Sequence, residues 1–293
     1  MYFLTQMEQK YLLGRIYPLI RKSGVSEDLR GWNWPNPPVR PYYQTRAPMY
    51  LVCSKYCPTN RNVFLSAVKG IRGEYTYSLS LGTTMHKLAE DCFNSILNGR
   101  EERFEDWWNR NYSEISDPNW VDPIRRKAEK VWNYIVIQSK SLISSRKVEQ
   151  PYSTERDVMA TAIPLLVGHR ISGELLGLSG LLNIDAFDYL RNIVFDLKVS
   201  PEERDWYRLY PTGYAMVLEG VYGVPVDIGA VVYLNFKGDD PVIKKDIFFI
   251  GDELRSWWIE ERDEKLEIIS ERKDPGIAEN CDARCPYYNY CRG

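Results

Sequence analysis

Residues 178–199, LSGLLNIDAFDYLRNIVFDLKV, contain two apolar segments, 178–190 and 192–199, joined by a tight turn at 188–192. This pattern predicts two strands. Because side chains alternate between the two faces of a strand, the odd-numbered residues from 193 to 199 form one fully apolar face. The opposite face carries an acid and a lysine two residues apart, Asp196 and Lys198. The second strand therefore combines a core face with a possible reaction site.

The first strand adds a second carboxylate. Asp185 points away from its apolar neighbours and precedes Asp196 across the short hairpin, so the two carboxylates can converge. Converging carboxylates repel each other unless a cation lies between them. A lysine beside that cation can orient the attacking water or neutralise charge that develops on a phosphate. Taken alone, Asp196 and Lys198 fit a solvent-facing pair at a strand edge better than a metal site.

A histidine and an acid upstream favour the metal site. His86 and Glu90 are four residues apart on a predicted helix, so they share one face of it. We expect Thr83 or Thr84 to cap this helix and the helix to extend to about Asn98. His86 is one of only two histidines in the chain.

The rest of the chain reads as a mixture of helices and strands. Five prolines between residues 31 and 50 exclude a helix or a central strand and indicate an extended arm. The apolar period changes at 157–168, which has β-branched members. Helices are predicted at 2–22, at 101–148 (two or three, broken near 117–118), at 203–222 and at 251–272. Further strands are predicted at 227–236 and 242–250, joined by a hairpin turn at 237–240.

Composition narrows the class of protein. The 293 residues are 44% hydrophobic and 27% charged, which is typical of a globular chain rather than a disordered one. No apolar run approaches the length of a membrane span, and the first 22 residues are too polar for a secretory signal. We therefore expect a cytoplasmic protein. The net charge of −2 is not that of a globally basic DNA-binding protein, so DNA contact requires a local basic cluster or a bound cation.

Three of the six cysteines, Cys281, Cys285 and Cys291, occupy the last thirteen residues, while Cys53 and Cys57 lie far upstream. Thiols stay reduced in the cytosol, so this spacing suits zinc or an iron–sulfur cluster rather than disulfides. Cys92, on the predicted His86 helix, is expected in the core.

The order of these motifs resembles that of the RecB-like nucleases of the PD-(D/E)xK type. The matching elements are Gly82-x-x-x-His86-x-x-x-Glu90, Gly180 to Asp185, Asp196-Leu197-Lys198, and the helix Tyr214-Ala-Met-Val-Leu-Glu219. The resemblance implies an α/β fold with a mixed sheet flanked by helices. It also implies Mg²⁺ or Mn²⁺ bound by His86, Asp185, Asp196 and the Leu197 carbonyl, with Lys198 and Tyr214 completing the catalytic set. Tyr210, followed by Pro211, stands where this family usually has glutamine.

One upstream cysteine and three C-terminal ones resemble the iron–sulfur nucleases of CRISPR systems, in the archaeal subtype. The resemblance implies a [4Fe–4S] cluster that joins Cys57, Cys281, Cys285 and Cys291; Cys57 is favoured over Cys53 because Pro58 follows it. It divides the chain into an N-terminal helix, arm and first cysteine (1–80), a helical insertion with His86 (81–150), a nuclease core (151–272) and a cysteine segment (273–293). Zinc is the alternative occupant.

The resemblance further implies a metal-dependent exonuclease that acts on single-stranded DNA ends. Its role would be to process DNA fragments for CRISPR spacer acquisition, alongside the integrase proteins and without a membrane. The alternative is a DNA-binding or docking subunit of the integration complex, in which Tyr210-Pro211 marks lost activity. A zinc-stapled interaction domain is a third reading.

Overall fold

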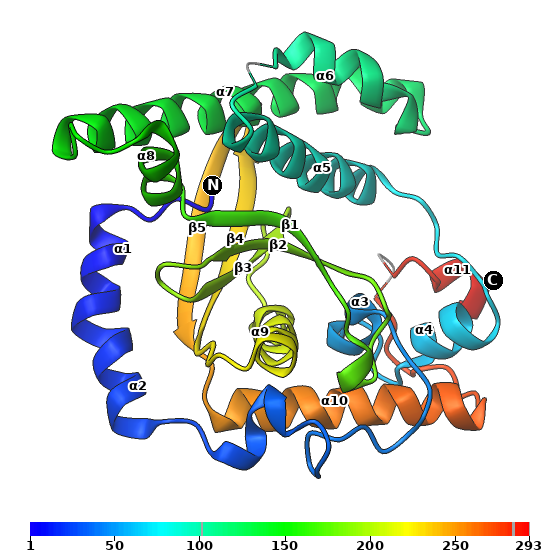
Figure 1. Cartoon of the computed structure of the whole chain (residues 1–293). Coiled ribbons are helices and arrows are strands. Elements are labelled where there is room, and N and C mark those ends of the chain that lie inside the picture. The colour runs from blue at the N-terminus through cyan, green and yellow to red at the C-terminus, as the bar shows by residue number, and fades with distance from the viewer. Residues whose placement is uncertain (101, 283–284, 293) are drawn as a thin grey trace.

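A five-stranded mixed sheet forms the centre of the protein (Figure 1). The computed structural model describes residues 1–100, 102–282 and 285–292. The strands lie side by side in chain order: β1 (Leu165–Ile171), β2 (Leu182–Asp188), β3 (Ile193–Lys198), β4 (Ile228–Lys237) and β5 (Asp240–Phe249). All neighbours are antiparallel except β3 and β4, which are parallel. The predicted α/β fold with a mixed sheet flanked by helices is confirmed.

Local chemistry explains both tight turns of the sheet. Between β2 and β3, an Asp188 carboxylate oxygen accepts hydrogen bonds from the backbone N–H groups of Leu190 and Arg191, at 3.0 and 2.9 Å. Asn192 then takes the left-handed conformation that asparagine tolerates. Between β4 and β5, Gly238 has a φ of 65°. Both predicted hairpins are therefore confirmed, with β2 beginning at Leu182 rather than at 178.

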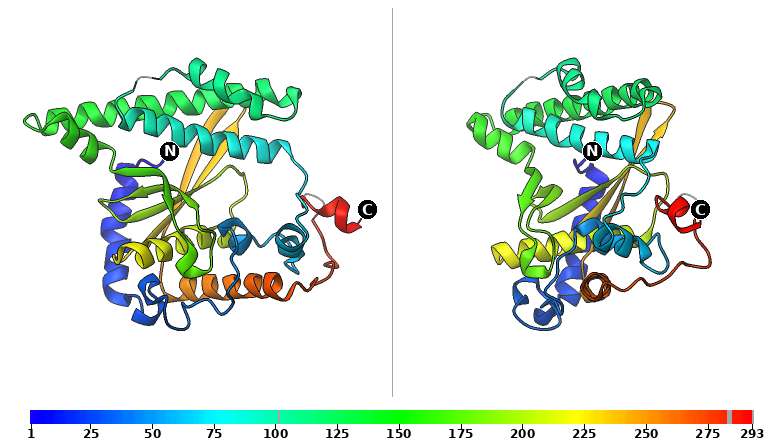
Figure 2. Two further views of the ribbon diagram at one scale, coloured as in Figure 1. Left: turned by 45° about the vertical axis from the view of Figure 1, so that its right-hand side comes forward. Right: turned by 90° about the vertical axis from the view of Figure 1, so that its right-hand side faces the viewer.

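Helices cover both faces of the sheet (Figure 2). In the view of Figure 1, α5 and the long α7 lie above the sheet, α9 and α10 lie below it, and α1 and α2 run along one side. The helices are α1 (Gln6–Tyr11), η1 (Leu12–Ile16), α2 (Tyr17–Ser23), η2 (Glu27–Leu29), η3 (Gly31–Asn33), α3 (Met49–Cys53), α4 (Arg61–Val63), η4 (Phe64–Val68), α5 (Tyr77–Leu97), α6 (Phe104–Asn111), η5 (Tyr112–Glu114), α7 (Pro118–Glu149), α8 (Glu155–Ala162), η6 (Glu174–Leu176), η7 (Asp205–Arg208), α9 (Leu209–Tyr222), α10 (Asp252–Glu271) and α11 (Tyr288–Arg292).

The two faces of β3 belong to two hydrophobic cores, whereas its alternation predicts a core only on the odd-numbered face. Ile193, Phe195 and Leu197 pack in the core that α5 and α7 share with the buried N-terminal residues. Val194, on the other face, packs in the core under α9, α10 and α3. Because the strand is covered on both faces, Asp196 is also buried, at 3% exposure. The acid therefore lies inside the protein and not on a solvated strand face.

The His86 helix begins earlier than predicted. α5 starts at Tyr77, where the Thr76 hydroxyl accepts a hydrogen bond from the Leu79 N–H at 3.3 Å. The hydroxyls of Thr83 and Thr84 instead donate to carbonyls one turn back in the same helix. The prediction that either residue caps the helix is wrong, because a threonine within a helix bonds backward in this way.

Two other boundaries differ for identifiable reasons. Residues 155–162, part of the stretch where the period changes, form α8 with Thr154 as its N-cap, and the strand begins only at Leu165. The predicted helix 203–222 begins at Leu209, after the 3₁₀ turn η7. Pro211 falls in the first turn of α9, where a missing N–H costs no intrahelical hydrogen bond.

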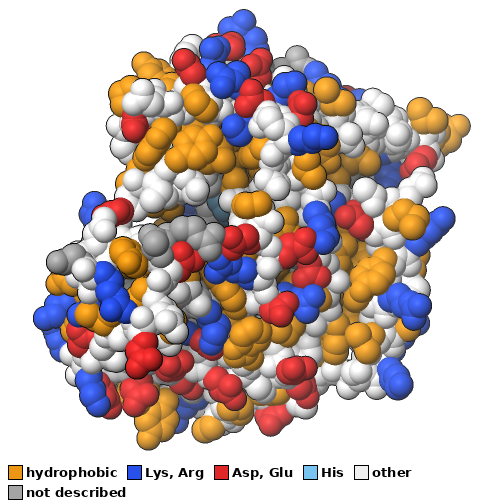
Figure 3. Space-filling model, turned by 180° about the vertical axis from the view of Figure 1, so that it is seen from behind, with side chains coloured by type: hydrophobic (Ala, Val, Ile, Leu, Met, Phe, Trp, Pro, Cys, Tyr) orange, Lys and Arg blue, Asp and Glu red, His pale blue; other side chains and the backbone are white. Residues whose placement is uncertain are grey.

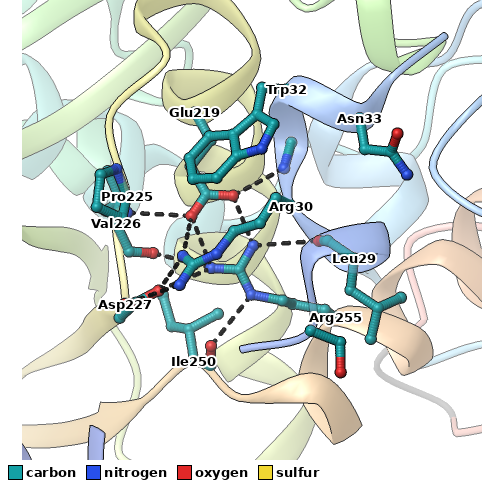
Figure 4. A network of polar contacts seen from close by, with 12 residues as sticks. Leu29, Arg30, Trp32, Asn33, Glu219, Pro225, Val226, Asp227, Ile250 and Arg255 are labelled. Atoms are coloured by element: carbon teal, nitrogen blue, oxygen red, sulfur yellow. Dashed lines mark hydrogen bonds and ion pairs between the residues drawn. The ribbon is translucent and has the colours of Figure 1, made fainter. Parts of the chain in front are cut away.

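A buried charge network anchors the arm and α10 to α9 (Figure 4). Glu219 is fully buried and accepts hydrogen bonds from Arg30 at 2.7 Å, from Arg255 at 2.7 and 2.9 Å, and from the Gly31 and Val226 N–H groups. Although burial alone would raise it, these contacts hold the pKa of Glu219 below its ordinary value. Arg30 and Arg255 also contact Asp227. Buried charges are tolerated when they are paired in this way.

The cysteine-rich end lies against the segment that carries the upstream cysteines. Phe64 and Leu65 of η4 form a small core with Tyr287, and Cys285 and Cys291 pack against it. Residues 283–284 and 293 of the predicted cysteine segment lie outside the described residues. In the part of the chain that the structure describes, no helix is long and apolar enough to cross a membrane.

Candidate active site

The site forms where β2 and β3 stop pairing. Their backbone register ends at Ala186 opposite Phe195. Beyond that pair the Asp185 carboxylate takes the place of a backbone acceptor, because its Oδ2 accepts the Leu197 N–H at 2.7 Å. In a strand the N–H and C=O of one residue point to the same side. The Leu197 carbonyl therefore faces the gap that Asp185 bridges.

Helix α5 places a second pair of groups on β2. His86 Nδ1 lies 2.9 Å from Asp185 Oδ1, and Glu90, one helical turn later, accepts a hydrogen bond from the Asn183 amide at 2.9 Å. The four-residue spacing on the helix thus matches the two-residue spacing on the strand. Gly168 on β1 makes room for this approach: it has a φ of +63°, and a Cβ there would lie 2.4 Å from the Glu90 carboxyl carbon.

Asp196 and Lys198 complete the group. The Lys198 Nζ lies 2.7 Å from Asp196 Oδ2. The contact is an ion pair rather than a well-directed hydrogen bond, and among the described residues Asp196 Oδ2 has no hydrogen-bond partner. The predicted residues His86, Asp185, Asp196, Leu197 and Lys198 are therefore brought together at one place in the fold.

The electrostatics separate the two carboxylates. Burial raises the pKa of Asp196 to about 6, against the attraction of Lys198, and repulsion from Asp185 adds to the rise. Burial would also raise the pKa of Asp185, but His86 and the Leu197 N–H hold it below its ordinary value. The pKa of His86 is raised because the Asp185 carboxylate outweighs the effect of burial. The ionised Asp185 carboxylate is thus compensated by groups of the protein, whereas the Asp196 carboxylate has too little positive charge around it.

Helix α9 contributes tyrosines to the floor of the site. Burial raises the pKa of Tyr214 well above its ordinary value, and the charges of Asp185 and Asp196 add to the rise. Tyr210, from the first turn of the same helix, has its ring centroid 3.3 Å from Lys198 Nζ. The ring of Tyr207 lies 5.4 Å from the same atom.

Most of the donor set has the chemistry that Mg²⁺ or Mn²⁺ prefers. Two carboxylates and a backbone carbonyl suit such hard cations, whereas an imidazole is a more usual ligand of Zn²⁺ or Fe²⁺. The surroundings of Asp196 Oδ2 also fit a cation, because among the described residues this buried oxygen has no hydrogen-bond donor and contacts only the Lys198 ammonium as an ion pair. In the present arrangement His86 and Asp185 bond each other. Within residues 1–100, 102–282 and 285–292, no three His, Cys, Asp or Glu side chains surround one metal-sized position.

The cysteines separate into distinct environments. The pKa of Cys285 is raised by burial and further by its neighbours Cys57, Cys291 and Cys281, so these four thiols share one neighbourhood. Cys53 is fully buried in the core under α9, α10 and α3, where burial raises the pKa of its thiol, and its charged neighbours are Lys198 and Asp196 rather than the other thiols. All six cysteines are free thiols. Cys92 is a core residue as expected.

Several residues of these sites carry no recognisable signal in the sequence. The Arg61 guanidinium, four residues after Cys57, donates to Cys291 Sγ at 3.2 Å and pairs with Asp274 at 2.9 Å. Gly168 and Asn183 lie in ordinary strand sequence. Tyr210 was noted only as a departure from a pattern, with no indication that its ring contacts Lys198.

One face of the protein surface is of mixed charge. Figure 3 shows the face opposite to that of Figure 1, where acidic and basic side chains are interspersed and a hollow opens below the helices at the top. No large area of one sign covers this face. A polyanion would therefore depend on local contacts rather than on the field of the whole molecule.

Comparison with known proteins gives a consistent result over the whole chain. A family model described as CRISPR-associated exonuclease Csa1 matches residues 1–293. The CRISPR-associated exonuclease Csa1 of Saccharolobus solfataricus is 28% identical over 297 residues, and the alignment covers 99% of each chain. A relative of the same description from Thermoproteus tenax is 30% identical over 300 residues, again with 99% of each chain covered.

Proposed function

The chain belongs to the Csa1 family of CRISPR-associated exonucleases, and from this premise we propose that it is a metal-dependent deoxyribonuclease with its active site between α5, β2 and β3. The observation that carries the proposal is the convergence of His86, Asp185, Asp196 and Lys198 where β2 and β3 separate. The burial of Asp196, which raises its pKa to about 6, supports the same proposal, because carboxylates with such raised pKa values cluster at functional sites.

The residues would divide the work as follows. His86, Asp185, Asp196 and the Leu197 carbonyl would hold Mg²⁺ or Mn²⁺. The bound cation would supply Lewis-acid chemistry at the scissile phosphate and a more acidic water. Lys198 would place its ammonium where negative charge develops on the phosphate, and Tyr214 would help to position the DNA strand. The cation would also reduce the repulsion between Asp185 and Asp196.

We propose that the substrate is DNA and that the enzyme degrades it from a single-stranded end. The family name supports an exonuclease linked to CRISPR systems, and the mixed surface charge favours local contacts over the capture of long duplex. The product would be trimmed fragments for integration into a CRISPR array, with integrase proteins as partners.

A second part of the proposal concerns the cysteines. Cys57, Cys281, Cys285 and Cys291 would ligate a [4Fe–4S] cluster, or alternatively zinc, that joins the two ends of the chain. Their shared neighbourhood supports this. A cluster that closes the long loop between Cys57 and Cys281 would also restrict the unfolded chain. Iron analysis and absorption at about 400 nm after anaerobic purification distinguish an iron–sulfur cluster from zinc, since only iron–sulfur ligation gives a brown protein.

The nuclease proposal is tested by digestion of end-labelled linear single-stranded DNA with Mg²⁺ or Mn²⁺. Wild-type protein should shorten the strand, and Asp196→Ala and Lys198→Ala should not. Lys244→Ala is the matched control, because Lys244 is exposed and pairs with Glu203 on the surface; it should cut like wild type. Circular single strands should resist digestion if cleavage starts at ends.

Failure would take a recognisable form. If neither wild type nor the control cuts with either cation, while the wild type binds single-stranded DNA, the enzyme proposal is abandoned for that of a docking subunit. Cleavage that survives in Lys198→Ala would instead show that the reaction occurs at another site.

A further inference from the structure

Lys198 lies between a carboxylate and an aromatic ring. Its ammonium is 2.7 Å from Asp196 Oδ2 and 3.3 Å from the centre of the Tyr210 ring, and the Tyr207 ring lies 5.4 Å away. The Lys198 side chain is only 16% exposed. A cation over the face of an aromatic ring is attracted by the ring quadrupole, most strongly where water is excluded. The contact thus acts on the charged end of the side chain and not merely on its stem.

We propose that Tyr210 is a positioning residue for Lys198: the face of its ring holds the ammonium beside Asp196. The inference rests on the proposed nuclease function. A lysine has a flexible four-carbon stem whose rotamer freedom opposes any fixed position of the charge. The carboxylate alone holds the ammonium from one direction, whereas the ring and the carboxylate together limit it from two.

The ring itself is held firmly. Arg208, two residues earlier, pairs with Asp246 on β5 at 2.7 Å, which ties η7 to the sheet. The Thr212 hydroxyl donates to the Arg208 carbonyl at 2.8 Å and closes the turn that contains Tyr210. Pro211 is buried against β4, where a Cβ on Gly229 would lie 3.0 Å from its own Cβ. The tyrosine and proline that depart from the usual pattern therefore form one rigid unit.

Further aromatic side chains lie next to Tyr210. The Trp206 and Tyr207 rings meet edge to face with their centroids 4.3 Å apart, and the Trp206 ring lies 6.5 Å from that of Tyr210. Tyr207 also packs on Tyr233 of β4. This packing fixes the orientation of the ring face, so the position of the Lys198 charge follows from the fold of the η7–α9 junction.

The first test compares Tyr210→Leu with Tyr210→Phe in the nuclease assay. Phenylalanine keeps the ring face and should retain activity within about threefold, whereas leucine should lower kcat about 10- to 30-fold with KM little changed. Tyr134→Leu, a half-buried tyrosine of α7, is the control for general loss of packing and should not change kcat.

A second test does not depend on catalysis. Lys198 acylation by a small activated ester is followed by peptide mass spectrometry, with exposed Lys244 as the internal reference. Lys198 should react slowly in wild type and Tyr210→Phe, and about tenfold faster in Tyr210→Leu. Equal Lys198 labelling in all three proteins would overturn the proposal, as would a kcat loss in Tyr210→Phe as large as that in Tyr210→Leu. A protein that does not cut DNA but shows the labelling difference retains the positioning role and loses only the nuclease function.

Discussion

Replacing Asp196 with asparagine is expected to stabilise the cation-free protein at pH 7 and to abolish its stabilisation by Mn²⁺. Asp196 is 3% exposed, and one of its oxygens has no hydrogen-bond partner among the described residues. Asparagine has nearly the same shape but carries no charge. The substitution therefore removes the cost of the buried charge while leaving the packing of β3 in place.

The pKa gives the size of the effect. Burial raises the pKa of Asp196 from 3.8 to about 6. Because the folded state has the higher pKa, the neutral carboxyl is fully favoured below about pH 4, and that stability is lost as the pH rises through about 6. At pH 7 ionised Asp196 lowers the free energy of unfolding by about 3 kcal/mol relative to its neutral form, since each tenfold change in proton affinity corresponds to about 1.4 kcal/mol. With an unfolding entropy of about 2.1 cal/mol/K for each of the 293 residues, Tm should rise by about 5 °C.

The assay is thermal and urea unfolding in chelator, at pH 5 and pH 7, with the iron content of each sample checked beforehand. The Tm of Asp196→Asn should exceed that of wild type at pH 7 and approach it at pH 5. Added Mn²⁺ should raise Tm only for wild type. Asp239→Asn is the control, because Arg126 lowers the pKa of that surface carboxylate and its removal should not stabilise. A lower Tm for Asp196→Asn at pH 7 would refute the assigned cost of the buried charge.

Three further outcomes are expected. Glu219→Gln should lower the free energy of unfolding by about 3–5 kcal/mol in urea titrations, because it leaves buried arginines undercompensated; the exposed Glu203→Gln should change it by less than about 0.5 kcal/mol. Gly168→Ala should lower Tm and weaken Mn²⁺ binding in calorimetry, because φ is +63° there and the new Cβ would meet Glu90; unchanged binding would contradict the close fit of α5 on β1. Cys57→Ser should lose bound iron after anaerobic purification while Cys53→Ser retains it, and the reverse result would reassign the fourth ligand.

The sheet and the central motif were predictable because their information is local. Alternation over residues 192–199 gave β3 and its two faces, and the turn residues gave both hairpins. The spacing of His86 and Glu90 gave their common helix face. The start of that helix was not predictable from threonine alone, since Thr76, Thr83 and Thr84 are all able to cap, and the tertiary contacts of residues 77–82 decide among them.

The arrangement of charges inside the fold depended on contacts between distant segments. α10 reads as a charged surface helix, yet Arg255, Arg262 and Lys265 are fully buried. Arg255 finds Glu219 on α9, and Arg262 donates to the Val39 carbonyl of the arm at 2.6 Å. No periodicity distinguishes such residues from solvated ones, because these two partners lie 36 and 223 residues away in the chain.

The sequence by itself determined the α/β class, the paired strands, the acid and lysine of β3, and the separation of upstream from C-terminal cysteines. These depend on side-chain period and turn chemistry, which act over a few residues. Only the tertiary structure decided that Asp196 is buried, that Asp185 bonds the Leu197 N–H, that Cys57 rather than Cys53 lies near the C-terminal thiols, and that the Tyr210 ring faces Lys198. Burial and ring orientation are set by what packs from elsewhere in the chain, and a local pattern carries no record of its distant neighbours.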